Sequence, residues 1–147
     1  MAVALLDINV LLALAWPNHV HHNAAHVWLA EHRRHGWATC IHTEMGFLRL
    51  SMQPAVVKTA VTFTDAMKAL TTSTTAREHV FWPLGCSFGE IGDEIRARIG
   101  GHHQLADAML LDLAIRHAGK LATFDLRVTS LLPRDSPNQS ALALIPV

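Results

Sequence analysis

The amino-terminal stretch MAVALLDINVLLALAW, residues 1–16, is the part of the sequence that decides the fold class. Residues 1–6 form an apolar run without helical periodicity, which is typical of a strand buried on both faces in a parallel sheet. The run ends at Asp7. Asn9 is suited to cap a helix over residues 10–15, which is apolar on every side and is therefore expected to be buried. The stretch predicts a strand, a carboxylate at its end and a buried helix.

The rest of the chain alternates predicted helices with short predicted strands. Alternation of this kind indicates a mostly parallel sheet covered by helices on both faces, which is a three-layer α/β/α sandwich. No repeat and no domain boundary is visible, so we predict a single domain over residues 1–147. The expected helices span residues 23–35, 43–53, 65–70, 87–99, 104–118 and 128–132, and the further strands span residues 37–41, 80–82, 120–124 and 141–145.

Three local signals set the expected ends of two helices. Thr64 is suited to cap the helix at residues 65–70. The Thr-Ser run at residues 71–75 then favours a polar loop. Gly119 is expected to end the helix at residues 104–118, because glycine is the usual residue just after a helix.

Composition limits the classes of function. The chain has 12 Lys and Arg against 12 Asp and Glu, and this zero net charge argues against nucleic-acid binding by overall positive charge. Cys40 and Cys86 lie far apart without metal-like spacing, which favours a reducing cytoplasm. The apolar residues 3–16 have no Lys or Arg before them and contain Asp7 and Asn9, so we expect neither a secretory signal nor a membrane span.

Four acidic residues fall where a parallel sheet would gather them. Asp7 and Asp125 follow expected strands, while Glu44 and Asp107 lie in the first turns of expected helices. Such positions meet at the carboxyl edge of an open sheet, where ligands bind. Clustered carboxylates repel one another unless a cation neutralises them, and oxygen ligands favour Mg²⁺ or Mn²⁺. A bound ion of this kind can activate water for attack on a phosphodiester, so the acids predict a nuclease.

Each acid taken singly also has a purely structural explanation. Asp7 can cap a helix, and Glu44 or Asp107 can complement a helix dipole. Asp112 illustrates the structural case, because Arg116 lies four residues later and an ordinary exposed ion pair on one helix explains it. The joint placement of the other acids is what favours a shared site.

The order of the acidic motifs resembles the PIN-domain family, and in particular the VapC toxins of bacterial toxin–antitoxin pairs. The resemblance spans essentially the whole chain and implies a PIN-like fold. It is carried by LLDINVLL at residues 5–12, by Thr43-Glu44, by Asp107-Ala108 and by Thr123-Phe124-Asp125. The resemblance implies one or two magnesium ions, with Thr123 supporting the last acid and Asn9 helping to hold the first. The implied metal ligands, which are also the implied catalytic residues, are Asp7, Glu44, Asp107 and Asp125.

The resemblance also implies an activity and partners. It implies an endoribonuclease that cleaves structured RNA, either transfer or ribosomal, and a cognate VapB-type antitoxin. It further implies a homodimer, which the many large apolar residues at 23–35 and 45–52 favour independently. Asp125 is followed by Leu126-Arg127 rather than by further acids, so the number of metal ions stays open.

Two other functions remain as alternatives. A haloacid dehalogenase-like phosphohydrolase also places an Asp at the end of its first strand, but it would want a second Asp at position 9, which is Asn9 here. A non-catalytic RNA-binding or interaction module with the PIN fold would not need all four acids. RNA cleavage that requires magnesium separates the ribonuclease from both.

Histidines are concentrated before and within the second expected helix. His22 and His26 have the spacing of two metal ligands, but no cysteine or acid nearby would complete a zinc site. A solvated rim beside the active-site groove, charged at lower pH, is the favoured interpretation, and it extends to His102 and His103. The segment contains His19, His21, His22 and His26. The candidate phosphate contacts are Arg33, Arg34, Arg49, Arg96, Arg98 and Arg127.

Overall fold

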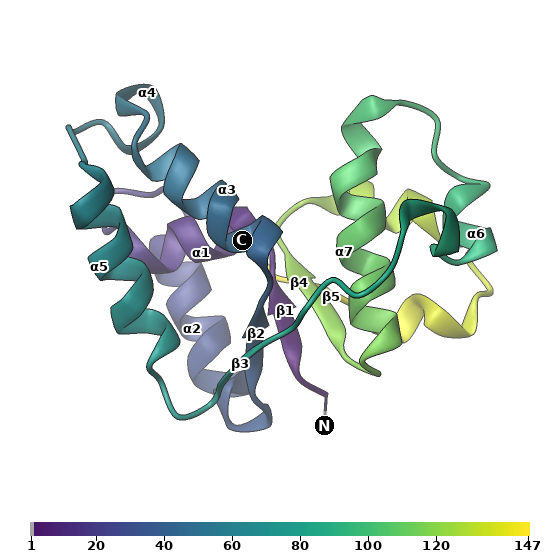
Figure 1. Ribbon diagram of the computed structural model, residues 1–147. Coiled ribbons are helices and arrows are strands. Elements are labelled where there is room, and N and C mark those ends of the chain that lie inside the picture. Colours follow the sequence, from purple (N-terminus) through teal and green to yellow (C-terminus); the bar gives the residue numbers. More distant parts are fainter. Residues whose placement is uncertain (1) are drawn as a thin grey trace.

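The computed structural model describes residues 2–147, and its centre is a five-stranded parallel sheet (Figure 1). In space the strands follow the order β3-β2-β1-β4-β5, so the first strand lies in the middle. The predicted three-layer α/β/α class with a parallel sheet is confirmed. The strands are β1 (Ala4–Leu6), β2 (Trp37–Thr39), β3 (His79–Phe81), β4 (Lys120–Thr123) and β5 (Leu142–Leu144).

Helices cover both faces of the sheet, and in Figure 1 they stand to its left and right. Within the described residues, no helix is long and apolar enough to cross a membrane. One face carries α1 (Ile8–Ala15), α2 (His22–His32), α3 (Ile41–Ser51) and α5 (Phe63–Thr74). The other carries α6 (Asp93–Arg96), α7 (Leu105–Arg116) and the 3₁₀ segments η4 (Leu126–Leu131) and η5 (Pro137–Ala141). The remaining short elements are η1 (Arg33–His35), α4 (Pro54–Val57), η2 (Phe88–Glu90) and η3 (His102–Gln104).

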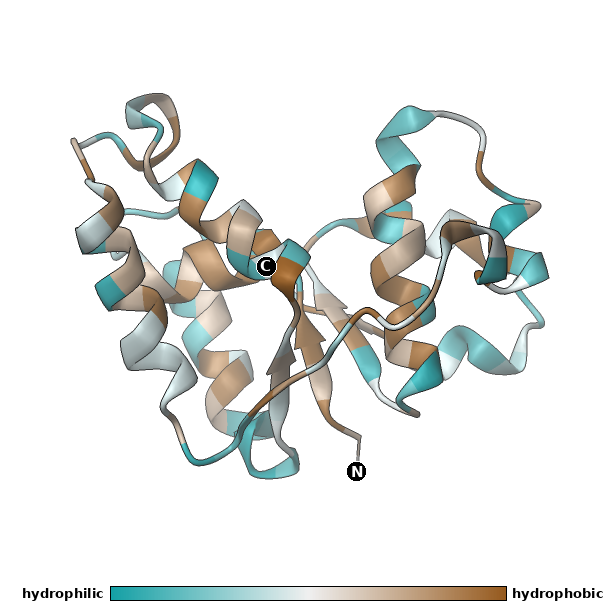
Figure 2. Cartoon of the chain, in the orientation of Figure 1, coloured by the Kyte–Doolittle hydropathy of each residue, from teal (hydrophilic) through white to brown (hydrophobic). Residues whose placement is uncertain are grey.

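Each face of the sheet buries its own apolar core. Because successive side chains of a strand point to opposite faces, Leu5 and Leu121 pack with α7, while Leu6 and Ala122 pack with α1. Figure 2 accordingly shows hydrophobic colour along the central strands and hydrophilic colour in the turn just before α7. Burial on both faces explains why the first strand is a continuous apolar run.

The side of β1 on which the chain adds strands to the sheet changes between β3 and β4. The chain first adds β2 and β3 on one side of β1, and then places β4 and β5 on the other side. In open parallel sheets this switch point is where ligands bind, beyond the carboxyl ends of the strands. Asp7 directly follows β1, and its N–H donates to the carbonyl of Ala122 in β4 at 3.0 Å. Asp125 follows β4 after one further residue.

The first helix begins earlier than the sequence predicts. The helix α1 starts at Ile8, and its N-cap is Asp7, whose carboxylate accepts the Ile8 N–H. The expectation that Asn9 caps the helix is therefore wrong, because Asp7 has extended backbone and an acceptor already in place at the strand end. The predicted strand at residues 1–6 is observed from Ala4, and Met1 lies outside the described residues.

The helix α5 is longer than predicted at both ends. Its N-cap is Thr62 rather than Thr64, because Thr62 and Asp65 form a reciprocal capping box with both bonds at 3.1 Å. The Thr-Ser run continues the helix to Thr74 instead of forming a loop. Hydroxyls in this run donate to carbonyls four residues earlier, as from Thr72 to Lys68, so they do not compete with the helical backbone.

The segment at residues 87–99 is not one amphipathic helix. It contains η2 and the single turn α6, separated at Gly92, whose N–H donates to the buried carboxylate of Asp112 at 2.9 Å. Four predicted strands differ from the observed ones by one or two residues at an end, namely those at 37–41, 80–82, 120–124 and 141–145. Two predicted helices are 3₁₀ in part, at 23–35, or wholly, at 128–132.

The end of α7 also differs from the prediction. The left-handed residue is Ala118, with φ of 51°, and Gly119 is not the cap. Gly119 is required for a different reason, since a Cβ there would lie 2.6 Å from the Val3 carbonyl oxygen and 2.7 Å from the Trp82 ring. This close passage lets the chain enter β4 directly beside β1.

Candidate active site

Asp7 is buried and firmly held at the end of β1. Only 8% of the Asp7 surface is exposed. One carboxylate oxygen accepts the Ile8 N–H at 2.7 Å, and the other accepts the Thr123 hydroxyl at 2.7 Å. Burial raises the pKa of Asp7, the hydrogen bonds from Thr123 and Ile8 oppose this, and the charge of Asp125 adds to it. A backbone N–H and the Thr123 hydroxyl therefore fix a carboxylate whose charge is poorly compensated.

Asp107 brings a second poorly compensated carboxylate from the first turn of α7. Its pKa is raised to about 6. Burial is the largest cause, followed by repulsion from Asp7 and from Asp125, with Arg127 opposing. A shift with these causes places the three acids within electrostatic reach of one another. We name Asp7, Asp107 and Asp125 the acid trio.

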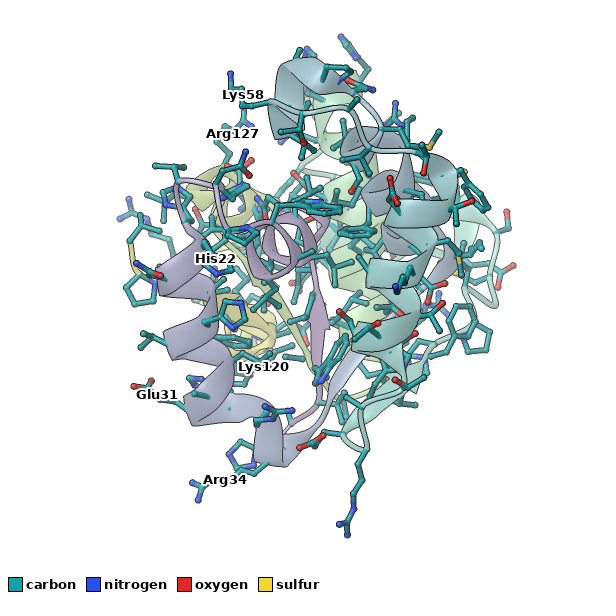
Figure 3. All side chains as sticks on the ribbon, turned by 90° about the vertical axis from the view of Figure 1, so that its left-hand side faces the viewer. His22, Glu31, Arg34, Lys58, Lys120 and Arg127 are labelled. Carbon is teal, nitrogen blue, oxygen red and sulfur yellow. The ribbon has the colours of Figure 1, made fainter. Side chains whose placement is uncertain are left out.

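Asp125 differs from the other two acids because it has a cationic partner. The Arg127 side chain donates to both of its oxygens, with the shortest bond from Nη2 at 2.7 Å, and the Arg127 backbone N–H donates at 2.9 Å. These bonds hold the pKa of Asp125 below its ordinary value. The guanidinium itself is largely exposed, and Figure 3 shows Arg127 near the top edge of the molecule. Asp125 thus stays ionised beside two acids that resist ionisation.

Thr123 connects two members of the acid trio. Its side chain is fully buried at the end of β4. The hydroxyl donates to Asp7 at 2.7 Å and accepts the backbone N–H of Asp125 at 3.1 Å. The expected supporting role of Thr123 therefore has a physical basis, because one hydroxyl fixes both the carboxylate of Asp7 and the backbone of Asp125.

Glu44 is held by a hydrogen bond to the end of β2. It accepts the Thr39 hydroxyl at 2.6 Å, and the same hydroxyl lies 2.8 Å from Nε2 of His79. Its helix α3 packs closely on α1, because a Cβ at Gly46 would overlap the Ile8 side chain. Across residues 2–147, no three His, Cys, Asp or Glu side chains stand in an arrangement that would hold a metal ion. Asp7, Asp107 and Asp125 are close enough for their charges to affect one another's pKa, while the carboxylate of Glu44 is bonded to Thr39 of β2.

A hard divalent cation suits the chemistry of the acid trio. All its donors are carboxylate oxygens, which Mg²⁺ and Mn²⁺ prefer. Burial and repulsion from neighbouring carboxylates raise the pKa of both Asp7 and Asp107, so the nearby positive charge does not balance the three acids. A cation bound among these acids would remove the repulsion that the shifts record.

Asn9 lies in the first turn of α1, where its side-chain carbonyl is buried without a hydrogen-bond partner. Among the described residues it makes no hydrogen bond to Asp7, so its expected role in holding that acid has no direct contact behind it. A buried acceptor left unpaired is costly in a native structure. Asn9 therefore has a free acceptor close in sequence to Asp7.

Two residues interact with the acids in ways that the sequence did not predict. His42, in the first turn of α3, lies close enough to Asp7 to oppose the rise of its pKa. Arg127 appears in the sequence only as a candidate phosphate contact, whereas it is the ion-pair partner of Asp125. The spacing of two residues between Asp125 and Arg127 was the available signal, because a helix-capping Asp accepts backbone N–H groups at that distance.

The histidine-rich segment lies mainly against backbone. His22 Nδ1 lies 2.7 Å from the Ala13 carbonyl, and His26 Nε2 lies 2.9 Å from the Leu14 carbonyl, both in the last turn of α1. The His21 ring packs on Phe124, with ring centroids 4.8 Å apart. These contacts give His22 and His26 a helix-capping role rather than a place at a metal site.

Asp112 is not the exposed ion-pair residue that the sequence predicts. It does pair with Arg116, at 2.6 Å, but it is buried. Its second oxygen accepts the Gly92 N–H, which fastens the segment before α6 to α7. Asp112 therefore has a structural role in the interior.

Comparison with known proteins gives a consistent family. Residues 4–131 match the family model described as the PIN domain. Ribonuclease VapC39 of Mycobacterium tuberculosis strain H37Rv is 42% identical over 124 residues, covering 83% of this chain and 88% of the relative. Ribonuclease VapC38 of the same strain is 40% identical over 129 residues, covering 88% and 89%. Ribonuclease VapC44 is 38% identical over 124 residues, covering 83% and 85%.

Proposed function

The chain belongs to the PIN-domain family and, within it, to the VapC ribonucleases, and we propose that it cuts RNA with a divalent ion held by the acid trio. It is an endoribonuclease toxin of the VapBC type, a hydrolase of phosphodiester bonds. Membership in this family argues against a haloacid dehalogenase-like phosphohydrolase. The retained acids argue against a non-catalytic module with the same fold.

One observation carries the metal proposal, namely the convergence of three acids: the Thr123 hydroxyl joins Asp7 to Asp125, and Asp107 lies near enough to both for their charges to help raise its pKa. Three carboxylates from distant segments are gathered at the switch point of the sheet although their charges repel. A helix cap or a dipole partner would not need that convergence. Binding of a cation does need it.

The side chains divide the work of such a site. When bound, the divalent ion supplies an activated water and stabilises negative charge on the phosphate. Asp7 and Asp107 are the proposed ligands with uncompensated charge, and Asp125 completes the trio. Thr123 holds Asp7 in one orientation, and Glu44 is the proposed fourth acid, at present bonded to Thr39.

Arg127 bears on the number of ions. Its guanidinium already neutralises Asp125, so the trio has about one positive charge supplied by the protein itself. We therefore propose a single Mg²⁺ or Mn²⁺ ion. Asn9 supports that site through its unpaired side-chain carbonyl, which can accept a hydrogen bond from a water.

The proposed partners are an RNA substrate and a cognate VapB-type antitoxin. The substrate is structured RNA, either transfer or ribosomal. Both partners would meet the carboxyl edge of the sheet, where the acid trio lies. The proposed location is the cytoplasm, where such substrates occur. We also propose that the chain works as one PIN domain over residues 1–147, since β5, beyond the matched residues, pairs with β4 in the same sheet.

The proposed homodimer has a candidate surface on the helices of one layer. Large apolar side chains are exposed along α3, α4 and α5, whereas α2 exposes Val27 alone among its large apolar residues. A continuous apolar surface is typical of an interface, and a twofold pair is the commonest arrangement. Sedimentation at tens of micromolar should give a dimer, and Met45→Glu should give a monomer. The exposed residues are Ile41, Met45, Met52, Val56, Phe63 and Met67.

The experiment that tests the function is a cleavage assay with purified protein and structured RNA. Cleavage should require Mg²⁺ or Mn²⁺ and stop when a chelator is added. Titrating the ion should give a simple one-site dependence if a single ion suffices. Cleavage that continues at full rate in excess chelator would contradict the metal proposal, and an absence of cleavage at every ion concentration would contradict the enzyme proposal.

A further inference from the structure

A polar pocket opens beside η4, on the layer that contains α7. Its volume is about 500 Å³, and most of its lining surface is polar. We name it the basic pocket, because it holds Arg98 and Arg134. Its lining residues are Arg98, Thr129, Ser130, Leu132, Arg134 and Gln139.

The two arginines of the basic pocket lack carboxylate partners. Within residues 2–147, neither Arg98 nor Arg134 forms a salt bridge, whereas four other arginines do. The charge of Arg98 acts on Glu94, but the Glu94 carboxylate makes its hydrogen bonds to other residues. It accepts the Ser136 hydroxyl at 2.7 Å and the Asn138 amide at 2.8 Å. Arg98 and Arg134 therefore line one pocket without a salt bridge, although the charge of Arg98 also acts on Glu94.

The basic pocket adjoins the acid trio through two elements. Thr129 and Ser130 lie on η4, which Asp125 caps. A 3₁₀ segment rises about 2 Å per residue, so these residues lie roughly 8 to 10 Å along the backbone from Asp125. Gln104, just before the helix that carries Asp107, donates to the Ser130 hydroxyl at 3.5 Å. The pocket therefore lies within reach of a strand whose phosphate is at the trio.

The polar groups of the pocket offer acceptors as well as cations. The Thr129 hydroxyl donates to the Leu126 carbonyl at 2.8 Å, and the Ser130 hydroxyl donates to the Arg127 carbonyl at 2.9 Å. The Gln139 amide donates to the Pro133 carbonyl at 2.9 Å. Their oxygen lone pairs remain available to accept hydrogen bonds. A phosphate needs donors, which the arginines supply, while a ribose hydroxyl also needs an acceptor.

We propose that the basic pocket binds the ribose-phosphate backbone of the RNA next to the cleaved bond, with Arg98 and Arg134 on phosphate. This inference rests on the proposed ribonuclease function and adds a substrate-binding site to it. Phosphate contacts position a nucleic acid without reading its sequence. The chain has no net charge, and its acid trio repels phosphate. A local pair of free arginines supplies the attraction that the whole protein lacks.

The test uses the double variant Arg98→Ala/Arg134→Ala in an Asp7→Asn background that cannot cut. Affinity for a single-stranded RNA is measured by fluorescence anisotropy at several salt concentrations. Each lost phosphate contact should lower the slope of log affinity against log salt by about 0.7. Two contacts then predict a slope change of about 1.4 and an affinity loss of roughly 20-fold near 0.1 M salt.

The matched control is Arg34→Ala in the same background. The sequence makes Arg34 a candidate phosphate contact, but the structure places it in η1, just before β2 and thus at the amino edge of the sheet, away from the acid trio. It is exposed and free of salt bridges among the described residues, and Figure 3 shows it at the end of the molecule opposite Arg127. It should leave affinity and salt slope unchanged. Arg98→Lys/Arg134→Lys should retain most of the slope, and circular dichroism checks that every variant folds.

The outcomes separate the two proposals. If the double variant binds RNA like the Arg34→Ala control, the basic pocket is not an RNA site, even if the wild type cuts RNA. If the wild type cuts no RNA, the proposed function fails, while the binding comparison still reports on the pocket. DNA of the same sequence should bind more weakly than RNA, and this preference should shrink in Gln139→Leu. If Gln139→Leu prefers RNA over DNA as strongly as the Asp7→Asn protein does, Gln139 makes no ribose contact and that part of the proposal is wrong.

Discussion

The acid trio and the histidine-rich segment are two groups of ionisable side chains that have different roles in the fold. The trio joins Asp7 to Asp107 and Asp125, which lie 100 and 118 positions later in the sequence, and burial with repulsion between carboxylates raises the pKa of two of its members. The histidines are crowded within a few positions, yet His22 and His26 are used to cap the end of α1. Crowding in sequence therefore did not make a site. Uncompensated charge gathered by the sheet is instead the basis of the site that we propose.

The largest expected effect is on catalysis by the acid trio. Asp7→Asn and Asp107→Asn should each lower RNA cleavage in Mg²⁺ by more than about 100-fold, beyond the range usual for residues outside the metal ligands. Each change removes a charge and preserves the shape. Glu31→Gln removes one exposed carboxylate from α2, which Figure 3 shows at the lower left, well away from Arg127, and should leave the rate unchanged. Losses of only a few-fold in both aspartate variants would end the comparison, because the trio would then be no more catalytic than the histidines.

A smaller loss of activity is expected at Thr123. Thr123→Ala removes the hydroxyl that donates to Asp7 and accepts from the Asp125 backbone, and should lower the cleavage rate by about 10- to 100-fold. Thr123→Ser retains the hydroxyl and should recover most of the rate. A rate in Thr123→Ala equal to that of wild type would show that the two acids hold their positions without it.

The pH dependence of stability measures the electrostatic strain in the metal-free protein. The folded pKa of Asp107, about 6, lies above its ordinary value of 3.8, so the folded state binds the proton more tightly and stability falls as pH rises from about 4 to 6. Asp107→Asn removes this loss. At pH 8 without metal it should melt about 2–4 °C above wild type, near 1 kcal/mol for a chain of this size.

Two further measurements sharpen that result. At pH 4 the difference in melting temperature should nearly vanish, since Asp107 is then protonated when folded. Adding Mg²⁺ at pH 8 should stabilise the wild type more than Asp107→Asn, because the ion binds the folded acids. A wild type that gains nothing from Mg²⁺ would show that the trio binds no ion.

The smallest effects are expected from the histidines. His22→Gln and His26→Gln remove contacts to the last turn of α1, and each should lower the free energy of unfolding by about 1 kcal/mol. RNA cleavage at pH 8 should stay within two-fold of wild type, roughly the spread of a neutral change. Binding of stoichiometric Zn²⁺ by the wild type, lost in His22→Gln, would reverse the assignment and make the segment a metal site.

The parts of the fold that follow from local pattern were predictable. Buried strands such as residues 4–6 and the apolar stripe of α7 depend on periodicity that the sequence displays directly. The segment at 87–99 was not predictable, because Gly92 breaks it through a bond to Asp112, twenty positions away. The extra length of α5 was missed because Thr and Ser favour loops unless their hydroxyls bond within the helix.

The candidate site divides in the same way. The acids could be named because strand ends and helix starts meet at one edge in a parallel sheet. The differences in pKa among these acids could not be predicted, because they depend on burial and on contacts such as the ion pair of Arg127 with Asp125. The bond from Thr39 to Glu44 likewise depends on how β2 faces α3.

The two hydrogen bonds to Asp7 have a consequence for how tightly the proposed ion is held. Its carboxylate has about four lone-pair positions, and Ile8 and Thr123 already use two of them. Two positions on Asp7 then remain for an ion, which would keep much of its hydration shell, as Mg²⁺ commonly does. Such an ion exchanges readily with solution. Occupancy, and with it the fraction of active toxin, would therefore follow the free magnesium concentration of the cell.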